Sequence, residues 1–310
     1  MSGPVTAEDA DLSASASSPA SAEVEITESR LSQVGALSVR RALPQRQRRT
    51  VGAWCFLDHG GPVEAPAGAF GIGPHPHIGL QTVTWILSGE LLHRDSLGSE
   101  QPIRPGQLNL MTAGHGIVHA EEHIRGGVVH VVQLWVAQPD ATREGRPAFE
   151  HHAELPQLDL GRGSRATVLV GSVGDARSRA RRDTDHVGAE VVLRSKVEVP
   201  ADPAYEHAVI ALEGVVEIEG KALMADQVAY LGTGRESIPL KSRGLARLIL
   251  LGGVPFQEPV LMWWNYVART RDEIIGAHND WSGRSERFKL PDSSLPPTDV
   301  GPPPWSLRNG

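Results

Sequence analysis

The sequence of 310 residues contains a single cysteine, Cys55. One thiol excludes an internal disulfide, which suits the reducing cytosol, and it provides no thiolate set for a soft metal. The sequence also lacks an excess of positive charge, because its net charge is −7 and its isoelectric point is about 6.0. There is therefore no overall electrostatic attraction to nucleic acid or to an anionic membrane.

Long apolar runs are missing as well. No run can span a bilayer, and the N-terminus lacks the basic start and apolar centre of a signal peptide. Nothing marks a large apolar surface for assembly. These absences predict a cytoplasmic monomer that binds neither a membrane nor nucleic acid directly. Hydrophobic residues at 40% and charged residues at 22% are ordinary for a globular protein, and the length allows about two domains.

The sequence does contain two short motifs with metal-ligand types at alternate positions. His75 and His77 flank a proline, and His119 and Glu121 flank an alanine. Alternate residues of a β-strand lie on the same face, so each motif would present two ligands to one side. If the two strands pair, three imidazole nitrogens and one carboxylate oxygen converge. This set predicts a mononuclear site for a first-row metal and favours an oxygen-using or redox-responsive protein.

The sequence between the two motifs is typical of short antiparallel strands. A run rich in β-branched and aromatic residues covers 80–87 and ends at a Ser-Gly turn. A Pro-Gly turn at 105–106 precedes the apolar run 108–111, and Gly114 and Gly116 interrupt the chain just before the second motif. The pattern predicts a meander with glycine at its corners, which is how small β-barrels are built.

Both motifs lie in longer stretches that resemble the pirin family. The first stretch reads HPHIGLQTV over 75–83, and the second reads MTAGHGIVHAE over 111–121. A third, GGVPFQEPVLMWWNYVARTRDEI over 252–274, is similar to that family's second half. The resemblance extends from about Ser32 to about Leu290. It implies a cupin barrel whose metal ligands are His75, His77, His119 and Glu121.

One position near the motifs departs from the family pattern, because this chain has Gln81 where the family usually has Glu. That position is not one of the usual ligands, so we expect the metal site to be retained with one charge fewer nearby and altered hydrogen bonding around it. We group Gln81, His115 and His123 as residues that surround the ligands or line the pocket. For His115, in a Gly-His-Gly loop, exposure to solvent is the simpler expectation. His123 shares the face of the second motif, and exposure at a strand end is its alternative.

The sequence predicts an all-β chain with two tandem cupin-type (jelly-roll) β-barrels and a short C-terminal helical segment. In the second barrel the one histidine in a strand context, His207, has no H-x-H or H-x-E partner, so we expect that barrel to be free of metal. The helical segment is expected from Trp263 to about Ala277. The expected divisions are a disordered tail over 1–28, a metal-binding domain over 29–138, a linker over 139–148, a metal-free domain over 149–290 and a loose Pro-rich tail over 291–310.

Three other features have structural interpretations. His130 lies in an apolar strand and is expected to be a hydrogen-bonded core histidine. Asp58 is expected to hold a turn before Gly60. A basic cluster is expected in a solvated loop, rather than at a contact with DNA or an acidic partner, and its members are Arg40, Arg41, Arg46, Arg48 and Arg49.

The ligand types suit Fe(II), Mn, Co, Ni, Cu or Zn. The resemblance implies Fe(II), and for bacterial members it implies quercetin 2,3-dioxygenase activity, in which a flavonol chelates the metal beside O2 and loses carbon monoxide on ring cleavage. In that reaction Glu121 is the candidate base for the flavonol hydroxyl. The expected substrates are then a small planar aromatic molecule and O2.

A binding role is the alternative. The resemblance also implies that eukaryotic members are co-regulators whose surface changes with the oxidation state of iron, so the partner here would be a transcription factor or a metabolic enzyme. An enzyme with a different small aromatic substrate is a third hypothesis. The pocket distinguishes these hypotheses, because an enzyme needs a cavity over the metal that accepts a planar ligand and a sensor does not.

Overall fold

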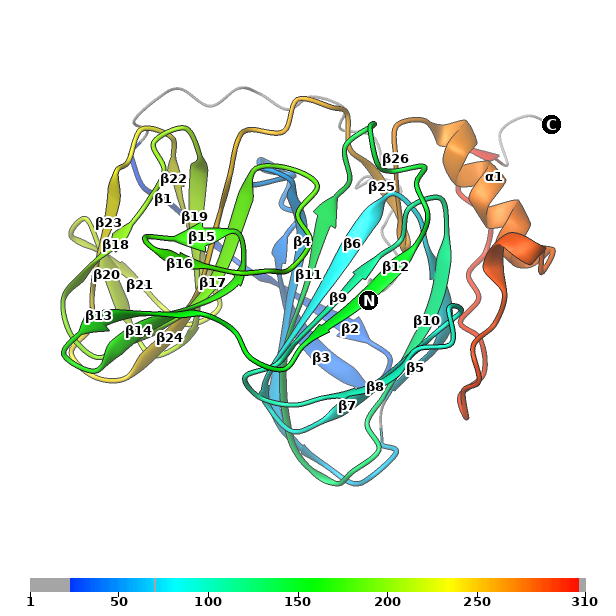
Figure 1. The fold of residues 1–310 in the computed structure, drawn as a ribbon, viewed down its shortest axis with the longest axis horizontal. Helices are drawn as coiled ribbons and strands as arrows, with labels where there is room; N and C mark the ends of the chain where they lie inside the picture. Colours follow the sequence, from blue (N-terminus) through cyan, green and yellow to red (C-terminus); the bar gives the residue numbers. More distant parts are fainter. Residues whose placement is uncertain (1–22, 70, 307–310) are drawn as a thin grey trace.

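The computed structural model describes residues 23–306 except residue 70, and these residues form two β-barrels side by side (Figure 1). The all-β fold with two jelly-roll barrels and a short helical segment is confirmed. Residues 1–22 of the expected disordered tail lie outside the described residues, as do residues 307–310. Within the described part of the chain, no helix has the length and hydropathy that a membrane-spanning segment requires.

The N-terminal barrel consists of a seven-stranded sheet that faces a four-stranded sheet. In spatial order the large sheet contains β12 (Ala148–His152), β9 (Leu108–Thr112), β6 (Leu80–Ser88), β11 (Gly127–Ala137), β4 (Trp54–Ala65), β3 (Leu37–Leu43) and β2 (Arg30–Val34). The small sheet contains β5 (Gly71–His77), β10 (Ile117–Glu122), β7 (Leu91–Asp95) and β8 (Glu100–Ile103). The two histidine motifs lie on β5 and β10, which are neighbours in the small sheet.

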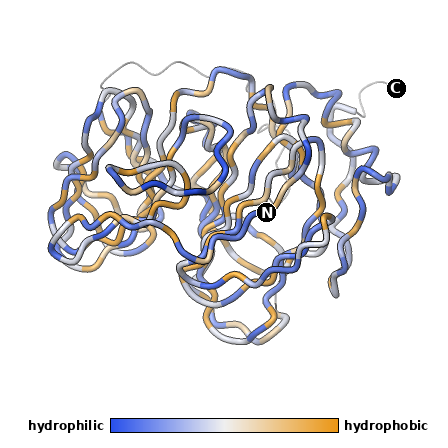
Figure 2. The backbone as a smooth tube through the Cα atoms, in the orientation of Figure 1, coloured by the Kyte–Doolittle hydropathy of each residue, from blue (hydrophilic) through white to orange (hydrophobic). Residues whose placement is uncertain are grey.

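The C-terminal barrel repeats the same arrangement. Its large sheet contains β1 (Glu25–Glu28), β22 (Gln227–Gly232), β19 (Glu206–Glu213), β24 (Ala246–Gly253), β17 (His186–Leu193), β14 (Ser164–Val170) and β13 (Gln157–Gly161). Its small sheet contains β18 (Val197–Pro200), β23 (Ser237–Lys241), β20 (Val216–Ile218) and β21 (Lys221–Leu223), and a hairpin of β15 (Ser172–Val173) and β16 (Ala176–Arg177) is added. Buried apolar and exposed residues alternate along β18 and the first half of β3, whereas β17 is buried along its whole length. Figure 2 shows apolar and polar residues interspersed along both barrels.

The two barrels exchange their edge strands. β1 comes from the start of the chain, yet it pairs with β22 of the C-terminal barrel. β12 follows the linker, yet it pairs with β9 of the N-terminal barrel. The expected tail over 1–28 is therefore wrong for Glu25–Glu28, and the expected domain start at residue 149 is wrong for β12. Each edge strand finds its hydrogen-bonding partners in the other half of the chain, so the barrels are joined by backbone ladders.

The pair of strands equivalent to β5 and β10 is apolar in the C-terminal barrel. β18 pairs with β23 so that Val199 lies opposite Ile238 and Val197 opposite Leu240. All four side chains are buried. Inward positions that carry imidazole and carboxylate groups in the first barrel thus carry valine, isoleucine and leucine in the second. We therefore propose that the second barrel holds no metal at this place.

The C-terminal segment covers the N-terminal barrel. It forms the hairpin β25 (Leu261–Trp263) and β26 (Tyr266–Ala268), helix α1 (Arg271–Ser282) and the 3-10 helix η2 (Glu286–Phe288), which lie beside β5 and β10 in Figure 1. The helix expected from Trp263 is wrong at its start, because aromatic and β-branched residues form the hairpin first. The helix begins only after Thr270, whose hydroxyl accepts the backbone N–H of Glu273 at 3.2 Å.

The Pro-rich tail is bound where it was expected to be loose. The backbone N–H of Thr298 donates to Pro74 O on β5 at 2.9 Å. The hydroxyls of Ser293 and Ser294 donate to the Glu122 carboxylate on β10 at 2.9 and 2.8 Å. A Cβ at Gly73 would collide with the backbone oxygen of Pro296, so the tail lies directly on β5. The tail therefore covers the outer edge of the strand that carries the first histidine motif.

Candidate metal centre

His75 and His77 both lie on the inner face of β5. Proline occupies the positions between and before them, which is tolerated because β5 is the edge strand of its sheet. Both histidine side chains are 1% exposed. β5 pairs antiparallel with β10 so that His119 lies opposite His75, and this register brings the two motifs to one place in the barrel.

Backbone carbonyls fix the orientation of two of the three imidazoles. His75 Nδ1 lies 2.9 Å from Gly73 O, and His77 Nδ1 lies 2.9 Å from Asn265 O in the β25–β26 turn. A carbonyl only accepts, so each Nδ1 carries the proton and each Nε2 keeps its lone pair for a ligand. The C-terminal segment thus helps to set the tautomer of His77, although 188 residues separate the two partners.

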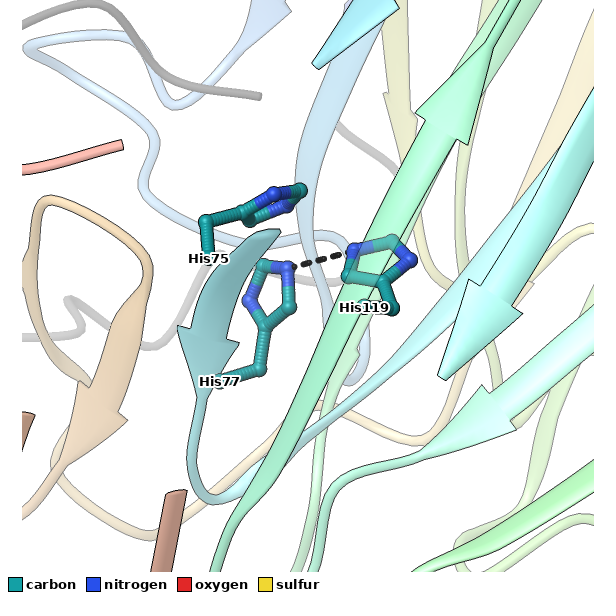
Figure 3. Close-up of side chains that lie close together, drawn as sticks. All are labelled: His75, His77 and His119. Carbon is teal, nitrogen blue, oxygen red and sulfur yellow. Dashed lines mark hydrogen bonds between the residues drawn. The ribbon is translucent and has the colours of Figure 1, made fainter. Parts of the chain in front are cut away.

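The three histidine rings converge on one point (Figure 3). Ligand atoms of His75, His77 and His119 all lie within 4.8 Å of one another. His77 Nε2 and His119 Nε2 are 3.0 Å apart. Two nitrogens that bind one ion at about 2.1 Å with a right angle between the bonds have this separation. The three nitrogens therefore fit one first-row metal ion.

Glu121 lies beside this triplet but in a second group. Its carboxylate lies within 4.8 Å of ligand atoms of His119 and His93, and these three residues are buried. The register between β10 and β5 shifts between His119 and Glu121, which displaces the carboxylate along the strand. The structure thus brings together three of the four ligands expected from the sequence, and His119 connects the fourth to them.

The Thr84 hydroxyl holds the Glu121 carboxylate from the opposite sheet, and the Gln133 amide contacts Thr84 in turn. Thr84 Oγ1 lies 3.1 Å from Glu121 Oε1 and 3.1 Å from the side-chain Oε1 of Gln133. One hydroxyl proton cannot serve two acceptors fully. Turning the Gln133 amide over resolves the conflict, because its NH₂ then donates to Thr84 and Thr84 donates to Glu121.

His93 and Asp95 were missed by sequence reasoning. His93 Nδ1 lies 3.4 Å from His119 Nδ1, and His93 Nε2 lies 3.1 Å from Asp95 Oδ2. The Asp95 carboxylate only accepts, so His93 Nε2 carries the proton, His93 Nδ1 accepts from His119 Nδ1, and His119 Nε2 keeps its lone pair. The ring of Phe149, on the exchanged strand β12, stacks on His93 at 4.3 Å. The signal in the sequence was a His-x-Asp pair on the strand between the two motifs.

Burial keeps the converging imidazoles neutral. It lowers the pKa of His75 to about 3, with a smaller opposing effect from the Gly73 carbonyl. Burial, followed by the neighbouring histidines, also places the pKa values of His77 and His119 well below the ordinary value. Neutral imidazole is the form that binds a metal ion, so the side chains are ready as ligands near neutral pH.

The three residues expected around the ligands have different positions. Gln81 is fully buried on β6, and its amide NH₂ donates to Thr112 Oγ1 at 3.0 Å. His123 is buried beyond the end of β10 and belongs to neither group of ligand atoms. His115 is exposed, which agrees with the expectation of a loop histidine in solvent rather than a pocket residue, and its Nδ1 lies 3.0 Å from Gly145 O. The glycines on both sides are buried, and a Cβ at Gly114 or Gly116 would collide with Gly145 or Phe288.

A small cavity lies beside Glu121. Its volume is about 50 Å³. The β2–β3 hairpin forms one wall with Val34, Leu37 and Val39, and the polar groups that reach the cavity include Glu121 and Gln133. A water molecule needs roughly 10–15 Å³ measured in this way, so the cavity holds a few waters and is too small for a flavonol.

Comparison with known proteins identifies the family. Residues 36–136 match the sequence profile of Pirin, and residues 189–289 match that of the Pirin C-terminal cupin domain. The chain belongs to the pirin family. A Pseudomonas aeruginosa relative, provisionally named quercetin 2,3-dioxygenase, is 42% identical over 97% of this pirin and 98% of its own length. A pirin-like protein of Caulobacter vibrioides is 37% identical over 86% of this chain and 95% of its own.

A solved structure shows the same architecture. The crystal structure of quercetin 2,3-dioxygenase from Acinetobacter baumannii superposes with a TM-score of 0.86 and 42% sequence identity. The superposition covers 90% of this pirin and 95% of that chain. The resemblance seen in the sequence is thus confirmed for both barrels.

Proposed function

We propose that this pirin is an Fe(II)-dependent dioxygenase for small planar aromatic molecules with adjacent hydroxyl and carbonyl oxygens, such as quercetin. The observation that carries the proposal is the convergence of three oriented, neutral imidazoles beside a buried carboxylate. The relatives named for quercetin 2,3-dioxygenase activity support it. When bound, the metal supplies a Lewis acid with open positions for oxygen ligands and for O2.

The residues of the chain have separate tasks in this proposal. His75, His77 and His119 hold the ion through Nε2. The Glu121 carboxylate accepts the proton of the substrate hydroxyl at an oxygen atom, and the Thr84 hydroxyl fixes its orientation. Because the ligands are buried, the site excludes bulk water, which strengthens these electrostatic interactions.

The small cavity has a direct consequence for this function. A flavonol enters only if the wall formed by the β2–β3 hairpin moves outward, since about 50 Å³ does not hold it. The same closed cavity favours the second candidate function, an iron-dependent redox sensor that binds a protein partner. Oxidation of the ion would add one positive charge in a buried site, where charges interact strongly.

The test is aerobic turnover of quercetin after anaerobic loading with Fe(II). We expect loss of the flavonol absorption band and release of carbon monoxide. His77→Ala is expected to lower the bound metal, because it removes one of three converging nitrogens. Glu121→Gln keeps the shape but removes the base, and its turnover is expected to fall by about a hundredfold or more. The matched control is His115→Ala, which changes an exposed histidine of the same motif and should retain both metal and activity.

The outcomes separate the two functions. Fully loaded protein that never bleaches quercetin contradicts the dioxygenase proposal and leaves the sensor. Protein that binds no metal after reconstitution contradicts both proposals. Glu121→Gln with unchanged turnover shows that another group accepts the proton.

A further inference from the structure

A second and larger cavity lies in the C-terminal barrel. Its volume is about 530 Å³, which is within the range of small-molecule sites. Its walls come from β17, β19 and β24 of the large sheet, from the segment 200–205 and from the β15–β16 hairpin. None of its lining residues belongs to the candidate metal centre, so it is a separate feature of the fold.

The inner wall of this cavity combines apolar side chains with one buried imidazole. Val173, Val187 and Leu250 are almost fully buried and give it an apolar surface. His207 is 1% exposed, and its Nδ1 makes no hydrogen bond of normal length and angle with a described residue, the backbone of Tyr205 being its one nearby acceptor. A buried polar atom without a partner is costly, so a ligand that satisfied it would be favoured.

The His207 ring packs directly against the neighbouring strand. A Cβ at Gly252 on the neighbouring strand β24 would come within 2.7 Å of His207 Cδ2, so the ring lies directly on that backbone. The Tyr205 ring lies 6.2 Å from it. Burial lowers the pKa of His207 to about 4; Asp202 and the Tyr205 backbone oppose this effect, and Arg235 adds to it. The neutral ring can therefore donate or accept one hydrogen bond near neutral pH.

One of the two arginines that line the cavity has no ion pair among the described residues. Arg182 forms an ion pair with Asp185 at 3.1 Å and lies 3.5 Å from the Tyr205 hydroxyl. The Asp202 carboxylate accepts the backbone N–H of Ala204 at 2.9 Å within its own turn. Arg177, exposed at the end of β16, pairs with Ser172 through its backbone, but its side chain has no hydrogen bond or ion pair with any described residue. Its guanidinium is thus available to a carboxylate, which it can bind through two parallel hydrogen bonds.

We propose that this cavity binds a small organic carboxylate with a flat apolar body, of the single-ring aromatic acid class. The carboxylate pairs with Arg177 at the rim. The ring lies against Val187 and Leu250, and a polar substituent on it reaches His207 Nδ1. This site is independent of the proposed dioxygenase function, because it shares no residue with the metal centre.

The test measures binding of 4-hydroxybenzoate to the full-length protein by isothermal titration calorimetry, with and without metal. We expect saturable binding at one site per chain. The neutral isostere 4-hydroxybenzamide and the ringless acetate should each bind at least about tenfold more weakly, because each lacks one of the two contacts. Arg177→Gln and His207→Gln should each weaken 4-hydroxybenzoate by a similar factor.

The controls decide where the probe binds. Arg179→Gln removes an exposed arginine two residues away that does not line the cavity, and it should leave the affinity unchanged. Circular dichroism and thermal unfolding verify that each variant is folded. The proposal is overturned if 4-hydroxybenzoate shows no saturable binding at millimolar concentration, or if Arg179→Gln weakens it as much as Arg177→Gln. It is also overturned if His77→Ala abolishes binding, because the probe would then occupy the metal centre.

Discussion

Substitution of Asp95 by asparagine should reverse a chain of hydrogen bonds that ends at the candidate metal ligand His119. Asp95 Oδ1 accepts the backbone N–H groups of Leu97 and Ser99 at 2.9 and 3.1 Å, while Oδ2 faces His93 Nε2. In Asp95→Asn the amide oxygen can keep the turn, so the NH₂ group faces His93. His93 must then accept at Nε2 and donate from Nδ1.

The reversed proton order is unfavourable for metal binding. A proton on His93 Nδ1 requires His119 to accept at Nδ1, which places the proton of His119 on Nε2, where the metal would bind. Restoring the correct tautomer leaves one hydrogen bond of the chain unmade, at a cost of about 1–3 kcal/mol. Metal affinity should therefore fall by about 10–100-fold, which is the usual effect of losing a partner of a metal-bound histidine.

The assay is competition for Co(II) against a chelator, with the visible cobalt spectrum as a reporter of coordination. Glu100→Gln is the matched control, because Glu100 is exposed on the neighbouring strand β8 and its loss removes the same charge. The control should bind Co(II) as the unchanged protein does. Unchanged affinity of Asp95→Asn, or an equal loss in both variants, would refute the role of the hydrogen-bond chain.

Three further outcomes are expected. Arg41→Met should lower the free energy of urea unfolding by about 3–5 kcal/mol, because it leaves the buried Asp58 carboxylate without its ion pair at 2.7 Å. Adding Asp58→Asn to this variant should recover most of the lost free energy. A loss under about 1 kcal/mol in Arg41→Met would contradict a stabilising role for the ion pair. Truncation after Leu290 removes the hydrogen bonds to Glu122 and should lower both the thermal midpoint and Co(II) affinity; unchanged affinity would show that the tail does not support the site. Burial lowers the folded-state pKa of His130 to about 4, below its unfolded value, so the unfolded chain binds more protons between about pH 6.5 and 4. The free energy of unfolding should therefore fall as the pH decreases through that window. In His130→Gln this fall should be smaller by on the order of 2–3 kcal/mol, and an unchanged fall would contradict the assignment.

The barrels and the meeting of the two motifs were predictable because they depend on local patterns. Strand periodicity and glycine turns predicted the sheets, and alternate spacing placed His75 and His77 on one face. Antiparallel pairing of β5 with β10 then completed the triplet with His119. His130 was also correctly expected in the core, where its Nε2 lies 2.6 Å from His59 Nε2. A pattern of period two contains this information within one strand and its neighbour.

The remaining features depend on contacts between distant parts of the chain. Arg41 was expected in a solvated loop and Asp58 at a turn, but β3 and β4 pair so that the two residues lie opposite each other and form a buried ion pair. The exchange of β1 and β12 and the covering of β5 by the C-terminal tail likewise need partners far away in the sequence. No local pattern distinguishes a strand that pairs within its own barrel from one that pairs with the other. The displacement of Glu121 depends on a strand irregularity that composition does not reveal.

Anomalous diffraction from crystals of the protein loaded with Fe(II) or Co(II) would locate the ion itself. We predict one strong peak per chain, about 2.0–2.3 Å from the Nε2 atoms of His75, His77 and His119, with the Glu121 carboxylate on the same ion or beside it. No peak at this place in fully loaded protein, or a peak in the C-terminal barrel instead, would contradict the assignment of the metal centre.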